Sequence, residues 1–211
     1  MKLSKYYRSG RFAFNLAIIF GSIVLFGMAG GEKPWVKETD KNGVAVYLRD
    51  YDGSKFKEFK AQTKIKAPLK NILNLLIDVK SYPKWVFNNK GTFLIENKNN
   101  KEYIYYTQIK CPRPTEDRDA VIQFKIVEQS DSRCLIKTNA LPKYIAEKPG
   151  IVRVKEFTGM WELIRINENE TLVTTQSHTE PGGTVPVWLI NYFITTGPYS
   201  TLCNMKDMFK K

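Results

Sequence analysis

The chain has 211 residues, of which 43% are hydrophobic and 26% charged, a balance that suits one globular domain with a sizeable core plus an appendage. Its formal net charge is +12, from 33 basic and 21 acidic residues. The lysines are scattered and form no tight run interleaved with aromatics, so we expect no nucleic-acid partner; an anionic membrane surface fits better, with simple solubility as the alternative.

The first 31 residues differ from the rest of the chain. Four of the first eleven are basic, and residues 12–31 are uncharged and mostly apolar, which is typical of a secretory signal peptide. About 20 apolar residues also suffice to span a bilayer, so an uncleaved N-terminal membrane anchor is the alternative. The dense basic flank argues against a buried helix of a cytoplasmic protein. Both remaining interpretations predict a domain over residues 32–211, exported across or anchored in the cytoplasmic membrane and located in the periplasm or outside the cell.

The start of this domain indicates a strand pair. Residues 32–40 form a lead-in, which Trp35 is expected to pack onto the domain, and Asn42-Gly43 predicts a turn. Residues 44–51 and 56–65 both alternate in polarity, as strands with one buried face do. The turn residues at positions 52–54 join the two runs into a predicted hairpin.

A helical period follows the hairpin. Apolar residues recur at helical spacing from Leu69 to Leu76, directly after Pro68, which suits a first helical turn. We expect this helix to end near residues 78–80. Residues 81–87 then form a second short helix or turn that Tyr82 and Trp85 anchor.

Residues 92–179 indicate a meander of antiparallel strands. Alternation is clear over residues 103–109, and further strands are predicted over 119–129, 134–138, 151–157, 160–167 and 172–179. The break at Pro181-Gly182-Gly183 is interpreted either as a hinge or as a simple strand-to-helix turn. Helical spacing returns from Val185 to Phe209, and Pro198 predicts a kink because it has no N–H to donate to residue 194.

This order of elements predicts an α+β fold, in which a curved antiparallel sheet wraps around a long C-terminal helix. Three motifs in the same order carry a resemblance to a known family: YPKWV at 82–86, DRDAV at 117–121 and HTEPGGTVPVWLIN at 178–191. Over residues 35–211 the chain resembles the START family, the steroidogenic acute regulatory protein-related lipid transfer domain. The resemblance implies a helix-grip fold whose sheet and helix enclose an internal hydrophobic tunnel for one lipid. It also implies that charged residues near the DRDAV motif can face the tunnel.

Ten side chains are candidates for lining such a cavity, because they are aromatic, or polar within apolar strands. They are Tyr103, Tyr105, Arg118, Asp119, Phe124, Trp161, His178, Trp188, Tyr192 and Phe193. Each has a structural alternative. The aromatic side chains could simply form core, Arg118 and Asp119 could form an edge salt bridge or a turn cap, and His178 could be a satisfied structural histidine.

The sequence offers no convincing catalytic set. His178 is the only histidine, and the sequence places neither a nucleophile nor a second metal ligand beside it. Cys111, Cys134 and Cys203 fit neither a metal site nor a CxxC pair, and small buried hydrophobes are the favoured interpretation, with their disulfide state open. We therefore expect no cofactor, no metal and no enzymatic activity. We also expect a monomer.

Three functions remain as hypotheses. The leading one is binding of a lipid or sterol-like molecule in an internal cavity, for lipid transfer or sensing in the cell envelope. The alternative is a cyclase or aromatase on the same fold, for which His178, Glu180, Asp119 and Arg118 are the acid–base candidates. The third is an interaction module with a filled core, which the presence or absence of a cavity distinguishes from the other two.

Overall fold

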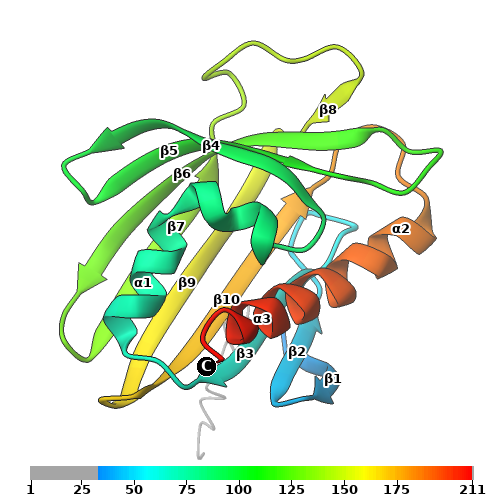
Figure 1. Ribbon diagram of the computed structural model, residues 1–211. Coiled ribbons are helices and arrows are strands. Elements are labelled where there is room, and N and C mark those ends of the chain that lie inside the picture. Colours follow the sequence, from blue (N-terminus) through cyan, green and yellow to red (C-terminus); the bar gives the residue numbers. More distant parts are fainter. Residues whose placement is uncertain (1–32, 211) are drawn as a thin grey trace, which may run out of the picture. The chain divides into compact units, whose positions relative to one another are not determined.

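The computed structural model describes residues 33–210, whose strands join in one sheet (Figure 1). The predicted signal or anchor segment, residues 1–31, lies outside the described residues. The strands are β1 (Val36–Lys41), β2 (Val44–Arg49), β3 (Glu58–Ile65), β4 (Asn89–Lys98), β5 (Glu102–Ile109), β6 (Asp117–Gln129), β7 (Arg133–Ala140), β8 (Ile151–Arg153), β9 (Glu156–Asn167) and β10 (Glu170–Glu180).

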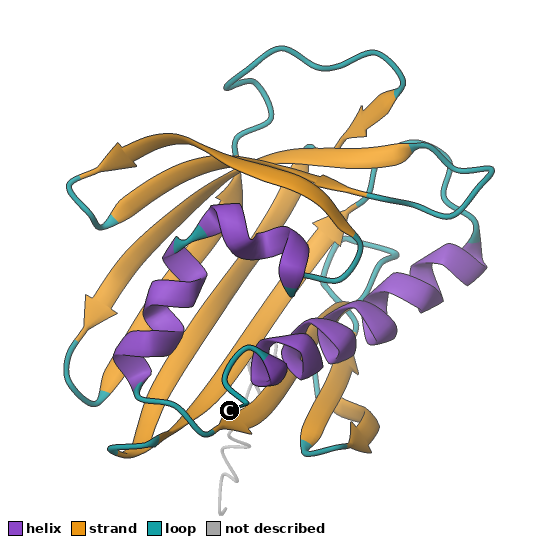
Figure 2. Cartoon of the chain, in the orientation of Figure 1, coloured by secondary structure: helices purple, strands orange, loops and turns teal. Residues whose placement is uncertain are grey.

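Along the sheet the strands follow the order β1-β2-β3-β10-β9-β7-β6-β5-β4, and every neighbouring pair is antiparallel. The short strand β8 lies off this path and pairs in parallel with the start of β6. The sheet curves, and the helices lie on its concave side (Figure 2). Helices on one side of an antiparallel sheet make an α+β fold, so the predicted helix-grip architecture is confirmed.

The predicted hairpin is formed by β2 and β3, which pair in register from Val44 opposite Thr63 to Arg49 opposite Glu58. Alternate residues of β2 are buried, as the sequence pattern predicted. The lead-in is more regular than expected. It forms the edge strand β1, and Trp35 before it packs against the cationic groups of Arg49 and Lys60, whose distances to the ring centroid are 4.3 and 4.7 Å.

Helix α1 (Leu69–Ile77) begins after Pro68 and buries the four apolar residues that predicted it, from Leu69 to Leu76. A 3₁₀ helix, Val79–Lys84, follows directly and corresponds to the predicted second helix. Its Tyr82 hydroxyl donates a hydrogen bond of 2.7 Å to the carbonyl of Leu76, which ties the two helices together. Trp85 then packs into the core with only 1% of its surface exposed.

The meander differs from its prediction at one place. The strand expected over residues 151–157 is divided into β8 and the start of β9, because the chain leaves β8 after Arg153. The amide of Val154 still donates to the carbonyl of Asp119 at 2.8 Å, so the break remains attached to β6.

The C-terminal helix is continuous rather than interrupted at Gly197-Pro198. It consists of α2 (Val187–Asn191), a π-helical stretch (Tyr192–Thr196) and α3 (Gly197–Asp207), which follow one another across the sheet (Figure 1). A kink was predicted at Pro198; the irregularity that the structure has there is the π-helical stretch directly before it, where wider turns accommodate a residue that cannot donate to the helical hydrogen bonds.

The hydrophobic core fills the concave side unevenly. Around α1 and α3 it is dense, and Leu202 and Met205 of α3 are fully buried in it. A smaller cluster lies on the opposite, convex face, where Ile104, Tyr106 and Val121 are covered by the connection between β7 and β8. The space between the sheet and the first half of the C-terminal helix is not filled in this way.

Candidate functional site

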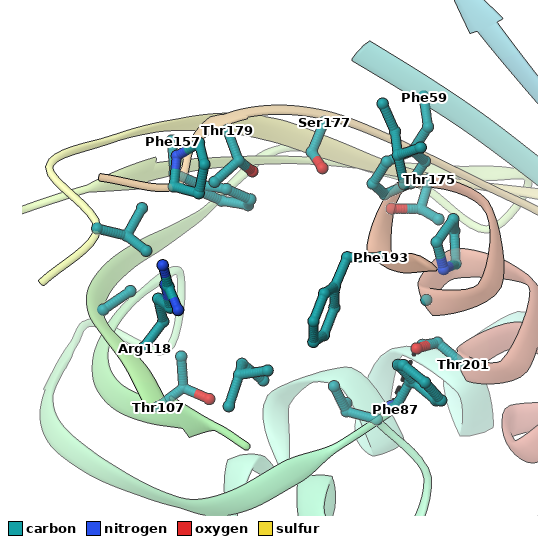
Figure 3. Close-up of a pocket in the computed structure, with 18 of the residues that line it drawn as sticks. Phe59, Phe87, Thr107, Arg118, Phe157, Thr175, Ser177, Thr179, Phe193 and Thr201 are labelled. Atoms are coloured by element: carbon teal, nitrogen blue, oxygen red, sulfur yellow. Dashed lines mark hydrogen bonds between the residues drawn. The ribbon is translucent and has the colours of Figure 1, made fainter. Parts of the chain in front are cut away.

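A cavity of about 400 Å³ lies between the concave face of the sheet and the first half of the C-terminal helix (Figure 3). This volume falls in the range of about 300–1,000 Å³ that is usual for small-molecule sites. The walls are mostly apolar, with a few threonine and serine hydroxyls and two cationic residues, Lys57 and Arg118. The cavity corresponds to the internal hydrophobic tunnel that the family resemblance implies.

The sheet side of the cavity follows from strand alternation. On β6, Arg118, Ala120 and Ile122 line the cavity, whereas Asp119 and Val121 between them face the convex side. On β10 the side chains of Ser177 and Thr179 face the cavity in the same way (Figure 3).

The helix side comes from residues spaced four apart, from just before α2 through the π-helical stretch to the first residue of α3. Val185, Leu189, Phe193 and Gly197 all line the cavity, at intervals of four residues. The ring of Phe193 projects into the space (Figure 3). Two glycines make the entry into this helix possible: Gly182 and Gly183 have φ of 68° and 62°, in the left-handed region that side chains avoid.

Arg118 is the main polar group of the cavity. It is 8% exposed, and its Nη1 donates to the backbone carbonyl of Glu116 at 2.6 Å. Within residues 33–210, no carboxylate oxygen lies within 4.0 Å of its guanidinium nitrogens. The Cys111 thiol beside it also lines the cavity; burial raises the pKa of this thiol, and Arg118 opposes part of that rise. The thiol therefore supplies no negative charge to Arg118.

Asp119 does not line the cavity, unlike its neighbour Arg118. It forms a buried ion pair with Arg153 on the convex side, with distances of 2.6 Å to Nε and 3.1 Å to Nη2. Arg153 also donates to the backbone carbonyls of Pro142, Ile145 and Ala146, so all five of its N–H donors are used. This ion pair fastens the connection between β7 and β8 to the sheet. Of the two roles considered for Asp119, the structure places it in the salt bridge.

His178 also lies away from the cavity lining, because it alternates with Ser177 and Thr179. Its ring stacks on that of Tyr51, with centroids 3.7 Å apart, and its Nε2 lies 3.2 Å from Oε1 of Glu180. Ser54 donates a hydrogen bond to the same carboxylate oxygen. These contacts attach the connection between β2 and β3 to the end of β10, which is a structural role.

The predicted aromatic residues divide into three groups. Tyr105, Trp161 and Phe193 line the cavity. Tyr103 and Phe124 pack edge to face in the core, with centroids 5.8 Å apart. Trp188 and Tyr192, on the outer side of the C-terminal helix, are 49% and 37% exposed. Four of the ten predicted residues, Tyr105, Arg118, Trp161 and Phe193, thus come together around the cavity, and ligand contact stays a prediction for each.

Several lining residues were not singled out from the sequence. They include Phe59, Trp85, Phe87, Cys111, Phe157, Thr175, Ser177 and Thr179. Thr175, Ser177 and Thr179 are alternate residues of β10 and lie on the same face of that strand. The alternation of the predicted strand was therefore a signal that could have identified them. Phe87 and Cys111 lie in connections, where no period predicts which way a side chain points.

Within the part of the chain that the structure describes, no three His, Cys, Asp or Glu side chains come together as a metal site requires. The three cysteines are free thiols. Nor is any helix between residues 33 and 210 both long and apolar enough to cross a membrane.

Comparison with known proteins relates this architecture to a family. The sequence model of the START domain matches residues 24–207. An uncharacterised protein of Pseudomonas aeruginosa is 34% identical over 189 residues, which cover 89% of this chain and 93% of that protein. The phosphatidylcholine transfer protein of Rattus norvegicus is 24% identical over 182 residues, covering 83% of this chain and 82% of that protein.

Solved structures agree with the sequence comparison. A STAR-related lipid transfer protein from Xanthomonas axonopodis superposes with a TM-score of 0.77 at 27% identity, covering 84% of this chain and 99% of that one. Human StAR-related lipid transfer protein 5 has the same fold, with a TM-score of 0.71 at 17% identity over 82% of this chain and 85% of that one. With the START model matching most of its length and the helix-grip fold in place, the chain belongs to the START domain family.

Proposed function

We propose that the protein binds one hydrophobic ligand, a lipid or sterol-like molecule, in the cavity and transfers or senses it in the cell envelope. The observation that carries this proposal is the cavity of about 400 Å³ under the C-terminal helix, with its apolar walls. Removing apolar ligand surface from water into such walls contributes about 25 cal/mol per Å². The names of the related lipid transfer proteins support the same class of ligand.

The place of action is the second part of the proposal. The basic start and the uncharged residues 12–31 support export across, or anchoring in, the cytoplasmic membrane. The net charge of +12 supports contact with an anionic membrane surface. Cell fractionation and the mass of the mature protein test this part: a full-length cytoplasmic product would refute it, and a shortened or membrane-bound product decides between cleavage and anchoring.

The enzyme alternative has less support from the site. Of its four candidate residues only Arg118 lines the cavity, and a guanidinium stays protonated and cannot exchange protons near neutral pH. His178, Glu180 and Asp119 are held by contacts outside the lining. The filled interaction module is disfavoured by the cavity itself.

Ligand binding is tested with the full chain in lipid nanodiscs. The wild-type protein should extract lipid and pass it from donor to acceptor vesicles, whereas Ala120→Phe should lose most of this transfer because the new ring fills the cavity. Ala45→Phe is the matched control, since Ala45 lies on the outward-facing side of β2. Equal transfer by both variants, or none by the wild type across a broad lipid panel, would contradict the proposal.

A further inference from the structure

Aromatic and cationic side chains gather on the convex side of the sheet, along the edge formed by β1, β2 and β3. The Nζ atom of Lys60 lies 4.7 Å from the ring centroid of Trp35 and 5.1 Å from that of Tyr47. The guanidinium of Arg49 lies 4.3 Å from the centroid of Trp35. On the other side of Tyr47, the Nζ atom of Lys37 lies 5.7 Å from its ring centroid. We call these five residues the edge cluster.

The edge cluster lies outside the hydrophobic core. Tyr47 and Arg49 alternate along β2 with residues whose side chains are buried, and none of the five cluster members is itself buried. Val36, the residue after Trp35, is an apolar side chain that is 57% exposed. Within residues 33–210, no carboxylate oxygen lies within 4.0 Å of the Nζ atom of Lys60. Partial burial and the neighbouring charge of Arg49 lower the pKa of Lys60, so an external negative charge would stabilise its ammonium form.

This combination of side chains matches the head-group region of a bilayer. Tryptophan and tyrosine are enriched at membrane–water interfaces, because their rings are apolar at one end and polar at the other. Each Lys or Arg near an anionic lipid surface strengthens binding by about fivefold. Within the cluster, Lys37 and Arg49 have the carboxylate partners Asp40 and Glu58. Lys60 is therefore the cluster member whose charge is available to a lipid phosphate.

The position of the cluster along the chain indicates which surface it meets. The uncharged, mostly apolar residues 12–31 end four positions before Trp35. An extended chain spans at most about 3.6 Å per residue, so the proposed anchor would keep Trp35 within about 14 Å of the point where residue 31 leaves the bilayer. The Debye length is about 10 Å at 0.1 M salt, which is comparable with this distance. The charge of the lipid surface therefore reaches the edge cluster.

The edge cluster also lies at the end of the sheet where connections between strands border the cavity. Val36 pairs with Leu48, one residue before the end of β2, and the chain then enters the connection between β2 and β3. Phe56 and Lys57 of this connection line the cavity. Docking through the edge cluster would therefore bring this end of the cavity toward the lipid surface.

We propose that the edge cluster is a docking surface for an anionic phospholipid membrane, with Trp35 in the interface and Lys60 beside the lipid phosphates. This docking rests on the proposed function, specifically on anchoring by residues 12–31, and it assigns the face of the domain that meets the lipid. The C-terminal helix, whose Trp188 is 49% exposed, is a different surface, and the experiment separates the two.

The test uses the full chain in nanodiscs whose lipids carry bromine on the acyl chains close to the head group, which quenches the fluorescence of nearby tryptophans. One set of nanodiscs is rich in phosphatidylglycerol, and the other contains only phosphatidylcholine. The chain has four tryptophans, so quenching of Trp35 is taken as the difference between the wild type and Trp35→Phe. Trp85 and Trp161 line the cavity and can meet a bound lipid there, but they contribute equally to both proteins. Trp188→Phe gives the corresponding value for the C-terminal helix.

Trp35 should be quenched in the phosphatidylglycerol-rich nanodiscs. Its quenching should be at least about twofold smaller in phosphatidylcholine, or at about 1 M salt, where the Debye length falls to about 3 Å. Lys60→Gln, measured with and without Trp35→Phe, should weaken docking about fivefold. Lys70→Gln is the matched control, because Lys70 is exposed on α1 at the concave side of the sheet, and it should behave as the wild type.

Equal quenching of the wild type and Trp35→Phe in the phosphatidylglycerol-rich nanodiscs would overturn the docking surface, whether Trp188 then carries the quenching or a protein partner covers the edge cluster instead. Quenching of Trp35 that is equal in both lipids and insensitive to salt would overturn the anionic part. Recovery of only a shortened chain outside the nanodiscs would refute the proposed anchoring and this docking with it. None of these results touches ligand binding, which the vesicle transfer assay with Ala120→Phe decides separately.

Discussion

Two consecutive residues of β6, Arg118 and Asp119, should affect stability in opposite directions when they are replaced. Asp119 is 1% exposed and, within residues 33–210, is the only carboxylate in an ion pair with Arg153, whose side chain is fully buried. Asp119→Ala leaves that guanidinium as an unpaired buried charge, a change that typically costs about 3–5 kcal/mol. Since domains of this size are stable by about 5–15 kcal/mol, the variant should lose a large part of its free energy of unfolding.

Arg118→Met removes a buried charge that has no carboxylate partner within residues 33–210. The variant loses the hydrogen bond to the carbonyl of Glu116, worth about 1 kcal/mol, and the contact with the Cys111 thiol. Against this, it no longer has to keep a guanidinium out of water, which costs several kcal/mol in a real protein. The ligand-free protein should therefore become more stable by about 1–2 kcal/mol.

The assay is urea unfolding of the full chain, followed by tryptophan fluorescence under identical micelle conditions. Asp131→Ala is the control for the aspartate variant, since Asp131 lies exposed in the turn between β6 and β7 and should change stability by less than about 0.5 kcal/mol. The reasoning fails if Asp119→Ala costs less than about 1 kcal/mol, or if Arg118→Met costs more than about 2 kcal/mol.

Three further substitutions test other parts of the fold. Trp85→Ala should cost about 3–5 kcal/mol in the same urea assay, because the indole is 1% exposed between the 3₁₀ helix and the sheet; a loss below about 1 kcal/mol would mean that the site collapses around the cavity. Gly182→Ala should cost about 1–2 kcal/mol, because its φ of 68° is unfavourable for any side chain, whereas Gly91→Ala, with open space around its Cβ, should be near neutral; equal costs would contradict the assignment. Burial raises the pKa of Cys134 from 9.0 to about 11, so the unfolded chain releases this proton first and stability should fall by about 2 kcal/mol as pH rises from 9.0 to about 11. Cys134→Ala should lack that part of the pH dependence, and identical slopes in both proteins would refute it.

Much of the fold could be predicted because each element has a period of its own. The alternation in β2 and β3 and the helical spacing of α1 are local properties, and both are confirmed. The strand β1 was missed because its residues are mostly exposed at the sheet edge, so no buried face produces a pattern. The break after β8 was missed because β8 is defined by its parallel pairing with the start of β6, which is distant in sequence and leaves no local pattern.

The candidate site was predictable only in part. Tyr105, Arg118, Trp161 and Phe193 line the cavity as predicted, and alternation along β6 and β10 explains why Asp119 and His178 do not. Helical spacing predicted that Trp188 and Phe193 lie on the same side of the C-terminal helix. The aromatic side of this helix is wider than the part of its surface that the sheet covers. The tertiary structure turned Phe193 inward and left Trp188 half exposed.

By itself, the sequence determined the kind and order of the elements, the motifs that relate the chain to the START family, and the basic, apolar character of residues 1–31. Only the tertiary structure decided that a space remains under the C-terminal helix and that Arg118 lines it with no carboxylate partner among the described residues. The physical reason is that polarity along a chain follows from local alternation, whereas an unfilled volume and an unpaired charge depend on side chains that distant strands bring together.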